Sequence, residues 1–189
     1  IQLSDIKGGL KKKDFMKYCS QCGAKNKLEI PQDDTKLRYI CTDCHFIHYE
    51  NPKIVVGTIP IFNDQVLLCL RAIEPRSNYW TLPAGFLENG ESIANGAIRE
   101  TEEEAMITPN IGPLLSIIDV VHANQVHIFF RATLDNLQFS PGVESLDVKM
   151  FNLSDIPWKQ IAFETVKITL EAQIEKEHGD FNPIYKTID

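Results

Sequence analysis

The sequence predicts a domain of the α/β (α+β) class, in which helices cover a mixed sheet, preceded by a small cysteine-rich module. The chain has 189 residues and is 43% hydrophobic, enough for one domain core and a small module. Runs rich in β-branched residues are interleaved with two stretches of helical periodicity, which favours a mixed sheet covered by helices. Four of the five cysteines fall between positions 19 and 44, apart from those runs.

The opening segment has little to pack with. It is polar, starts at Ile1, and carries Gly8-Gly9 and three consecutive lysines at 11–13. We expect residues 1–15 to be a flexible extension, of the kind that an expression vector adds, with Met16 as the natural start.

The next segment, 16–50, contains two C-x2-C pairs, Cys19/Cys22 and Cys41/Cys44. Two such turns at this separation are typical of a four-cysteine zinc site, and four thiolates make a closed, structural Zn²⁺ site. Two disulfides are the alternative, but they suit secreted proteins, and the sequence shows no signal-peptide pattern. We therefore predict a zinc ribbon, with His45 and His48 as bystanders.

The main domain, 51–189, begins with strands. The segments 53–62 and 65–71 are β-rich and are joined by Asn63-Asp64, a hairpin turn. A segment punctuated by proline and glycine follows, then a helix over 92–105. Further strands are predicted at 116–121, 126–134 and 147–153. Helical spacing predicts a last helix over 159–176, with an apolar face formed by Phe163, Val166, Leu170 and Ile174.

The first helix carries four glutamates in five residues. With ~100° per residue, the predicted buried stripe consists of Ala94, Ala97, Ile98, Thr101 and Ala105. Glu100, Glu103 and Glu104 share the flank beside it, Gly96 leaves that flank open, and Glu102 lies apart. Three carboxylates together suit Mg²⁺ or Mn²⁺; a solvated acidic face is the alternative.

The spacing before this helix favours the metal. Gly85 is followed after five residues by Glu91, and after seven more by Arg99-Glu100, Thr101, one residue and Glu103-Glu104. This resembles the Nudix box, G-x5-E-x7-R-E-U-x-E-E-x-G-U, where U is a bulky aliphatic residue. Two positions depart from it: Thr101 replaces an aliphatic residue, and Met106 replaces the glycine that ends the helix in a left-handed conformation. We expect Met106 to leave the helix by another route.

The resemblance covers about 53–173 and implies a Nudix α/β/α sandwich. With the ribbon before it, the chain looks like the zinc-ribbon subgroup and is similar to FAD/ADP-ribose pyrophosphatases in CSQCG, YWTLPAGFLENGES and SPGVESLDVKMFNLSDIPW. The SQPWPFP segment of NADH pyrophosphatases is absent, which leaves NADH as the less favoured substrate.

The resemblance also implies roles for individual residues. Glu100, Glu103, Glu104 and the carbonyl of Ala84 are the expected ligands of Mg²⁺ or Mn²⁺. Arg99 is expected to pair with Glu91 and Glu103 and to orient the acids. Glu103 and Glu144 are the candidates for the general base. The candidate substrate contacts are Arg71, Trp80 and Phe86.

The function predicted is metal-dependent cleavage of a dinucleotide, or of another nucleoside diphosphate linked to a second moiety, into two monophosphates. A non-catalytic nucleotide sensor is the alternative, and a third reading makes the ribbon a protein or nucleic-acid contact. A net charge of −7 and a pI near 5.3 argue against nucleic acid, and no run is long enough to span a membrane. We expect a cytoplasmic protein, and the resemblance implies a homodimer.

Overall fold

The computed structural model describes residues 16–175 and 182–189. The chain divides into two compact units, Ile1–Asn51 and Pro52–Asp189, called here the N-terminal and C-terminal units. The predicted extension over 1–15 lies outside the described residues.

The N-terminal unit contains a small antiparallel sheet in the order β1-β2-β3. Its strands are Asn26–Glu29, Arg38–Cys41 and Ile47–His48. Cys41 ends β2, and Cys44 lies in the turn that leads to β3. The sheet thus fixes the second cysteine pair at the end of a hairpin.

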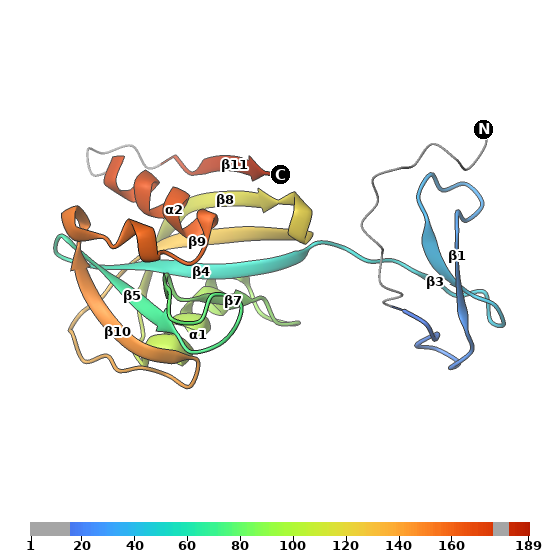
Figure 1. The fold of residues 1–189 in the computed structure, drawn as a ribbon, viewed down its shortest axis with the longest axis horizontal. Helices are drawn as coiled ribbons and strands as arrows, with labels where there is room; N and C mark the ends of the chain where they lie inside the picture. Colours follow the sequence, from blue (N-terminus) through green and yellow to red (C-terminus); the bar gives the residue numbers. More distant parts are fainter. Residues whose placement is uncertain (1–15, 176–181) are drawn as a thin grey trace. The chain divides into compact units, whose positions relative to one another are not determined.

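The C-terminal unit is built on an eight-stranded mixed sheet (Figure 1). Six strands follow the order β10-β5-β4-β9-β8-β11, with β6 beside β5 and β7 beside β4. The pairs β4/β9 and β8/β11 are parallel and the others antiparallel. The strands are β4 Lys53–Phe62, β5 Gln65–Arg71, β6 Trp80–Thr81, β7 Ala84–Phe86, β8 Asn110–Val120, β9 Gln125–Thr133, β10 Ser145–Asn152 and β11 Ile184–Ile188.

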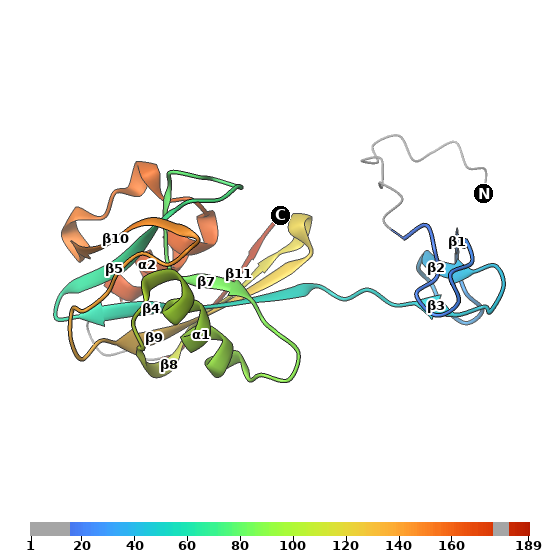
Figure 2. The ribbon, with the colours of Figure 1, turned by 90° about the horizontal axis from the view of Figure 1, so that it is seen from below.

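Two helices cover opposite faces of this sheet (Figures 1 and 2). They are α1, Ile93–Ala105, and α2, Glu164–Glu175. Strand β5 shows why both faces need cover, because its side chains alternate between two cores. Val66 and Leu68 join the core that includes residues of α2, whereas Leu67 and Cys69 join the core that includes Ala105 of α1. The predicted α/β/α sandwich is confirmed.

Strands β4 and β5 have the predicted bounds, but β8 begins six residues before the predicted start at 116. The added segment contains Gly112 and Pro113, which are unfavourable inside a regular strand. The structure accommodates both residues through register shifts between Ile111 and Leu114 and between Leu114 and Ser116, because a bulge removes the need for regular ladder bonds. The short strands β6 and β7, and β11, were not predicted.

Helix α2 begins at Glu164, not at 159 as predicted. Trp158–Gln160 form a single 3₁₀ turn, and Ile161 is extended. The amide of Ala162 then donates to the carbonyl of Trp80 at 2.8 Å. Pairing with β6 therefore replaces the first helical turn, while the predicted end at Lys176 lies outside the described residues. In the part of the chain that the structure describes, no helix is long and apolar enough to cross a membrane.

Candidate functional site

Helix α1 turns its acidic flank toward the sheet more than the sequence predicts. Its buried residues are Gly96, Ala97, Glu100, Thr101, Glu104 and Ala105. Ala94 and Ile98, which were placed in the stripe, are only half-buried. Two of the four glutamates thus lie within the packed face rather than beside it.

Thr101 fits this packed face because its hydroxyl both donates and accepts a hydrogen bond. Its Oγ1 donates to the Ala97 carbonyl at 2.8 Å and lies 2.6 Å from Oγ1 of Thr58 on β4. Both residues are completely buried. A buried hydroxyl is costly only when it lacks hydrogen-bond partners, because the bonds it makes offset the loss of water. This explains why threonine can occupy a position where the Nudix box has an aliphatic residue.

Glu100 lies directly against the backbone of Gly85. A Cβ at Gly85 would lie 2.3–2.5 Å from the atoms of the Glu100 carboxyl group, so only glycine leaves room for it. Burial raises the pKa of Glu100. The nearby Arg99 opposes that rise, whereas the charges of Glu103 and Glu144 add to it.

Arg99 holds three carboxylates in place. It binds Glu91 through Nε and Nη2 at 3.1 and 2.7 Å, Glu100 through Nη1 at 2.7 Å, and Glu103 through Nη1 at 3.2 Å. Its Nη2 also donates to the carbonyl of Phe86 at 3.1 Å. The bond to Glu100 had not been predicted. A guanidinium fork with this many charge-assisted bonds fixes the acids rather than facing outward.

Glu104 is the most deeply buried of the four glutamates of α1. It is 6% exposed, and its Oε2 has no hydrogen-bond partner. Burial raises its pKa to about 8, with a further rise from Glu100. Arg71 and the backbone of Ala84 lower it only in part. An unpartnered buried carboxylate is unstable as an anion without a cation beside it.

Glu144 lies close to Glu100 and Glu104, because it follows a loop whose backbone amides cap the C-terminal end of α1. The amides of Ser140 and Gly142 donate to the carbonyls of Ala105 and Glu104 at 3.1 and 3.0 Å. The approach is so close that a Cβ at Gly142 would lie 1.7 Å from the Glu103 carbonyl oxygen. This contact was not predicted from the sequence. The residue that could have indicated it is Gly142, two residues before Glu144. Glu144 itself is exposed, and its charge raises the pKa of Glu100 and Glu104.

Met106 does not leave the helix by a different route, contrary to expectation. It adopts the left-handed conformation itself, at φ 52° and ψ 36°, and its amide donates to the Glu102 carbonyl. The methionine thus occupies the conformation that the glycine of the Nudix box would take. Glu102 lies apart from the other acids, where its carboxylate accepts a hydrogen bond from Thr108.

The three predicted substrate contacts differ in their surroundings. Trp80 is 9% exposed and packs edge-on against Phe151 in the core, so its surroundings are those of a packing residue. Arg71 is half-buried, with its guanidinium 5.1 Å from the centre of the Phe163 ring. Phe86 is 49% exposed and follows Gly85 directly.

The acid group has the chemistry that a hard divalent cation requires. Glu100 and Glu104 are at least nine-tenths buried, Glu103 and Glu144 lie at the rim, and one carboxylate oxygen lacks a partner. Oxygen ligands of this kind are those that Mg²⁺ and Mn²⁺ prefer. The acids thus supply the oxygen donors that such an ion prefers, but no three of their carboxylate oxygens lie as close together as the four cysteine sulfurs do.

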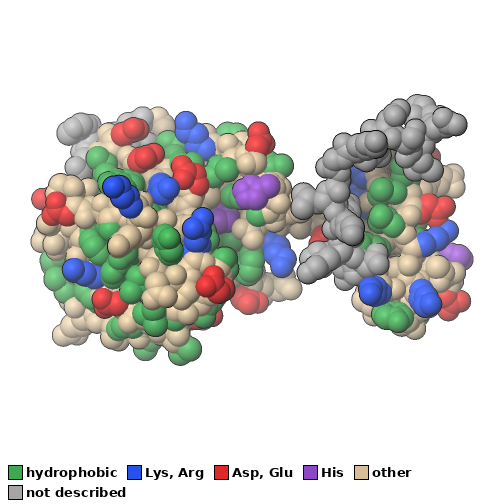
Figure 3. Space-filling model, in the orientation of Figure 1, with side chains coloured by type: hydrophobic (Ala, Val, Ile, Leu, Met, Phe, Trp, Pro, Cys, Tyr) green, Lys and Arg blue, Asp and Glu red, His purple; other side chains and the backbone are tan. Residues whose placement is uncertain are grey.

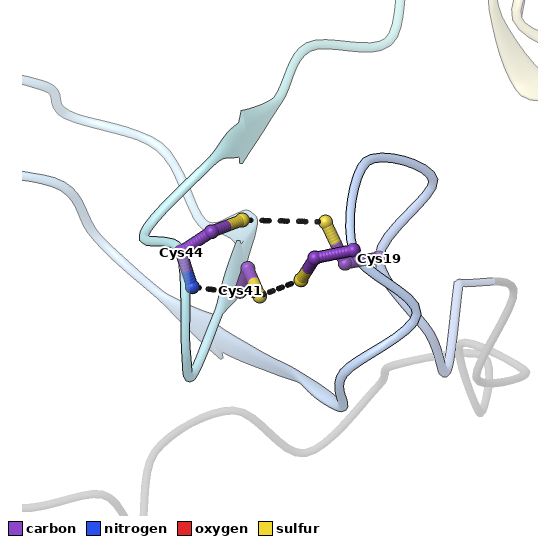
Figure 4. Close-up of side chains that lie close together, drawn as sticks. Cys19, Cys41 and Cys44 are labelled. Carbon is purple, nitrogen blue, oxygen red and sulfur yellow. Dashed lines mark hydrogen bonds between the residues drawn. The ribbon is translucent and has the colours of Figure 1, made fainter.

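The four cysteines of the N-terminal unit converge on one point, and Figure 4 shows three of them turned toward one another. All four sulfurs lie within 4.8 Å of one another, near the ~3.8 Å expected between ligands of a tetrahedral zinc with Zn–S of ~2.3 Å. Amides of Asp43 and Cys44 donate to Cys41 Sγ at 3.4 Å. Burial opposes ionisation, but these amides lower the pKa of Cys41 to about 6.

Cys69, His45 and His48 do not belong to this cluster. Cys69 is 1% exposed in the core, where burial raises its pKa. His48 packs edge-on against Phe46, and His45 lies in the turn after Cys44 with a positive φ. Among the described residues, the only group of three or more His, Cys, Asp or Glu ligand atoms this close together is that of the four cysteines.

Two protein-family profiles match the chain. The profile of the NUDIX domain matches residues 51–170, and that of the zinc-ribbon type Nudix N-terminal module matches 17–50. The chain therefore belongs to the Nudix hydrolase family and carries the family's zinc-ribbon module.

Three known proteins are similar to the chain to different extents. A crystal structure of a NUDIX hydrolase from Nitrosomonas europaea is 48% identical, covers 92% of this chain and 99% of its own, and gives a TM-score of 0.89. The ADP-ribose pyrophosphatase of Methanocaldococcus jannaschii is 26% identical over 64% of this chain and 72% of its own length. The NAD-capped RNA hydrolase NudC of Vibrio atlanticus is 34% identical, but the match spans 49% of this chain and only 32% of that protein.

Proposed function

We propose that the chain is a divalent-metal-dependent hydrolase that cleaves the diphosphate of a dinucleotide, or of a related nucleoside diphosphate linked to a second moiety, into two monophosphates. FAD and ADP-ribose are the proposed substrates, with NADH as a further candidate. The observation that carries the proposal is the pair of buried carboxylates, Glu100 and Glu104, one with an unpartnered oxygen.

The names of two relatives support this class of substrate. One is named an ADP-ribose pyrophosphatase and the other an NAD-capped RNA hydrolase. ADP-ribose and NAD share a diphosphate that joins two ribose-bearing halves. That shared linkage is the bond we assign to this site.

In the proposal Glu100, Glu103, Glu104 and the Ala84 carbonyl hold Mg²⁺ or Mn²⁺. Such an ion neutralises phosphate charge and lowers the pKa of a bound water. Arg99 and Glu91 orient the acids and do not touch substrate. Glu103 or Glu144 accepts the proton of the attacking water; both are exposed at the rim of the group.

The substrate contacts are proposed from the exposure and charge of the candidate side chains. Arg71 is the proposed phosphate contact and Phe86 the proposed contact for one half of the substrate. We assign Trp80 to the core. In the N-terminal unit, Cys19, Cys22, Cys41 and Cys44 are the proposed ligands of a structural Zn²⁺. A homodimer, expected from the resemblance, stays a prediction.

The test is a substrate panel with Mg²⁺ or Mn²⁺ and separation of the products. We expect FAD or ADP-ribose to yield two monophosphates. Glu103→Gln should lower kcat at least a hundredfold, because it removes a ligand or the base. Glu102→Gln is the matched control, since it lies on the same helix away from the group, and it should leave turnover unchanged.

Two results would overturn the proposal. One is the absence of metal-dependent turnover of any diphosphate substrate; tight nucleotide binding without turnover would then identify a sensor. The other is full activity in the Glu103→Gln variant, which would place the reaction elsewhere.

A further inference from the structure

The loop between β9 and β10, residues 134–144, is bonded through its backbone to the end of α1. The last carbonyls of a helix have no partner within the helix. In α1 the carbonyl of Glu104 accepts a hydrogen bond from the amide of Gly142 at 3.0 Å. The carbonyl of Ala105 accepts one from the amide of Ser140 at 3.1 Å. This loop, called here the Glu144 loop, therefore completes the C-terminal end of the helix.

The other end of the Glu144 loop is bonded to β5. The amide of Ala72, the residue directly after β5, donates to the carbonyl of Glu144 at 2.8 Å. The amide of Ser145 donates to the carbonyl of Gly142 at 3.1 Å and closes the turn between them. The backbone around Glu144 is thus held from two elements, so its carboxylate changes position mainly by side-chain rotation.

The loop meets α1 at very short range at Gly142. A Cβ at this residue would lie 1.7 Å from the carbonyl oxygen of Glu103, 2.8 Å from its carbonyl carbon and 3.2 Å from Cα of Glu104. All three are backbone atoms, so no rotation of a side chain can relieve the contact. Any residue with a Cβ would displace the loop by on the order of 1 Å, because a non-bonded carbon and oxygen approach to about 3.3 Å.

Gly142 is required for this close approach and not for an unusual backbone conformation. Among the described residues, the glycines with a positive φ are Gly23 and Gly90. Gly142 therefore does not take the left-handed conformation that favours glycine. A substitution at this position acts through the space between the loop and the helix.

The docked loop places Glu144 beside the buried acids of α1. Exposure alone does not distinguish this residue, because acidic side chains are common on protein surfaces, as on the face of the C-terminal unit in Figure 3. Its neighbours do distinguish it. Burial is the main cause of the raised pKa of Glu100 and of Glu104, and the charge of Glu144 adds to it in both.

We propose that Gly142 is a positioning residue, which lets the loop dock on α1 closely enough for the Glu144 carboxylate to take part in the reaction at the acids. The proposal rests on the proposed function, in which Glu144 is one of the two candidates for the general base. A group held on a fixed backbone needs no reorganisation before it acts. The contact at Gly142 supplies this fixed backbone.

The test compares kcat for Gly142→Ala, Glu144→Gln and the variant with both substitutions, at saturating Mn²⁺. The substrate is FAD or ADP-ribose, whichever the unaltered chain hydrolyses faster. Gly142→Ala should lower kcat about 100-fold, because a displacement of about 1 Å has an effect of this size. The variant with both substitutions should be about as slow as Glu144→Gln alone, since the group that the glycine positions is then already absent.

Gly112→Ala is the matched control. Gly112 also lacks a positive φ, and a Cβ there would lie 2.9 Å from the carbonyl oxygen of Arg131. This substitution crowds the β8/β9 pair instead of the loop. It should lower the unfolding temperature and leave kcat unchanged.

A second pair of variants tests the docking without adding an atom at Gly142. Ser140→Pro removes the amide that bonds to Ala105, whereas Ser140→Ala keeps it. Ser140 precedes Pro141, which favours the extended backbone that proline can also adopt. Ser140→Pro should lower kcat and speed the hydrogen exchange of the Gly142 amide, which is measured without substrate, and Ser140→Ala should do neither.

Full activity in Gly142→Ala or in Glu144→Gln would overturn the inference. So would losses that multiply in the variant with both substitutions, because the glycine would then act on a group other than Glu144. An equal loss of kcat in Gly112→Ala would also overturn it. Failure of the proposed function is a different result, since the unaltered chain would then show no metal-dependent hydrolysis of the diphosphate substrates.

Discussion

Met106 holds a left-handed conformation with a side chain that is 58% exposed. A residue with a Cβ pays about 1 kcal/mol or more there relative to glycine, and this side chain gains little burial in return. The loop at Ser140–Gly142 supplies further bonds to the end of the helix, which explains how the chain tolerates methionine at the position.

We expect Met106→Gly to raise the free energy of unfolding by about 1 kcal/mol, as measured by urea denaturation. Met106→Ala keeps the Cβ and is the control that should gain little. Equal stabilisation by both variants would show that the left-handed conformation is not the cause.

Glu104 gives the metal-free protein a stability that depends on pH. Its folded pKa, about 8, lies above the unfolded value of 4.5. A raised carboxyl pKa favours the folded state while the group is protonated, so its contribution is lost as pH rises from about 4.5 through about 8.

Glu104→Gln should therefore raise the unfolding temperature at pH 8 in protein freed of Mg²⁺ and Mn²⁺, and change it little at pH 5. The same variant should lose most of the stabilisation that Mn²⁺ gives the unaltered chain. Calorimetric scans at the two pH values, with and without Mn²⁺, measure both effects. A variant that is less stable at pH 8 would contradict the assignment of a strained, buried acid.

At the scale of elements, each helix is joined to the sheet by one buried pair of hydroxyls. Thr101 of α1 meets Thr58 of β4 at 2.6 Å, and Thr169 of α2 meets Ser116 of β8 at 2.9 Å. All four residues are completely buried. These pairs set the register of each helix on its face of the sheet in a way that apolar packing alone does not.

The pair at α1 is open to a double-mutant cycle. Thr101→Val should cost about 1–3 kcal/mol, because the Thr58 hydroxyl loses its partner in a buried site. The Thr58→Val/Thr101→Val variant should recover most of that loss, since no polar group is then left unpaired. Chemical denaturation of the two single variants and the double variant gives the coupling, and strictly additive losses would argue against it.

Local signals were sufficient for some elements and not for others. The segments 53–62 and 65–71 and the helix capped by Ser92 follow from periodicity and capping, which are local. The start of α2 depends on a bridge between Ile161 and Trp80, and β8 depends on bulges that accommodate Pro113. These are tertiary contacts, and no local pattern encodes them.

The same distinction applies to the candidate site. Spacing indicated which acids gather on one flank of α1, because the helical period is fixed. It did not indicate that Glu100 and Glu104 face the sheet, since that orientation involves the close approach of the Glu100 carboxyl group to Gly85 on β7.

At the scale of the whole molecule, the two units are stabilised by different means. The C-terminal unit has two apolar cores. Among the residues that the structure describes, the buried apolar residues of the N-terminal unit are Pro31 and two of the four cysteines, Cys19 and Cys41. A segment of this size without an apolar core depends on metal for its folding free energy.

Cys41→Ser should therefore release the zinc, from about one ion per chain, and unfold the N-terminal unit while the C-terminal unit keeps its own thermal transition. Metal analysis and calorimetry measure the two effects separately. His45→Ala is the control, because the four thiolates complete the tetrahedron without it, and it should retain the zinc. Retention of zinc by Cys41→Ser, or its loss from His45→Ala, would show that the ligand set differs from the four cysteines.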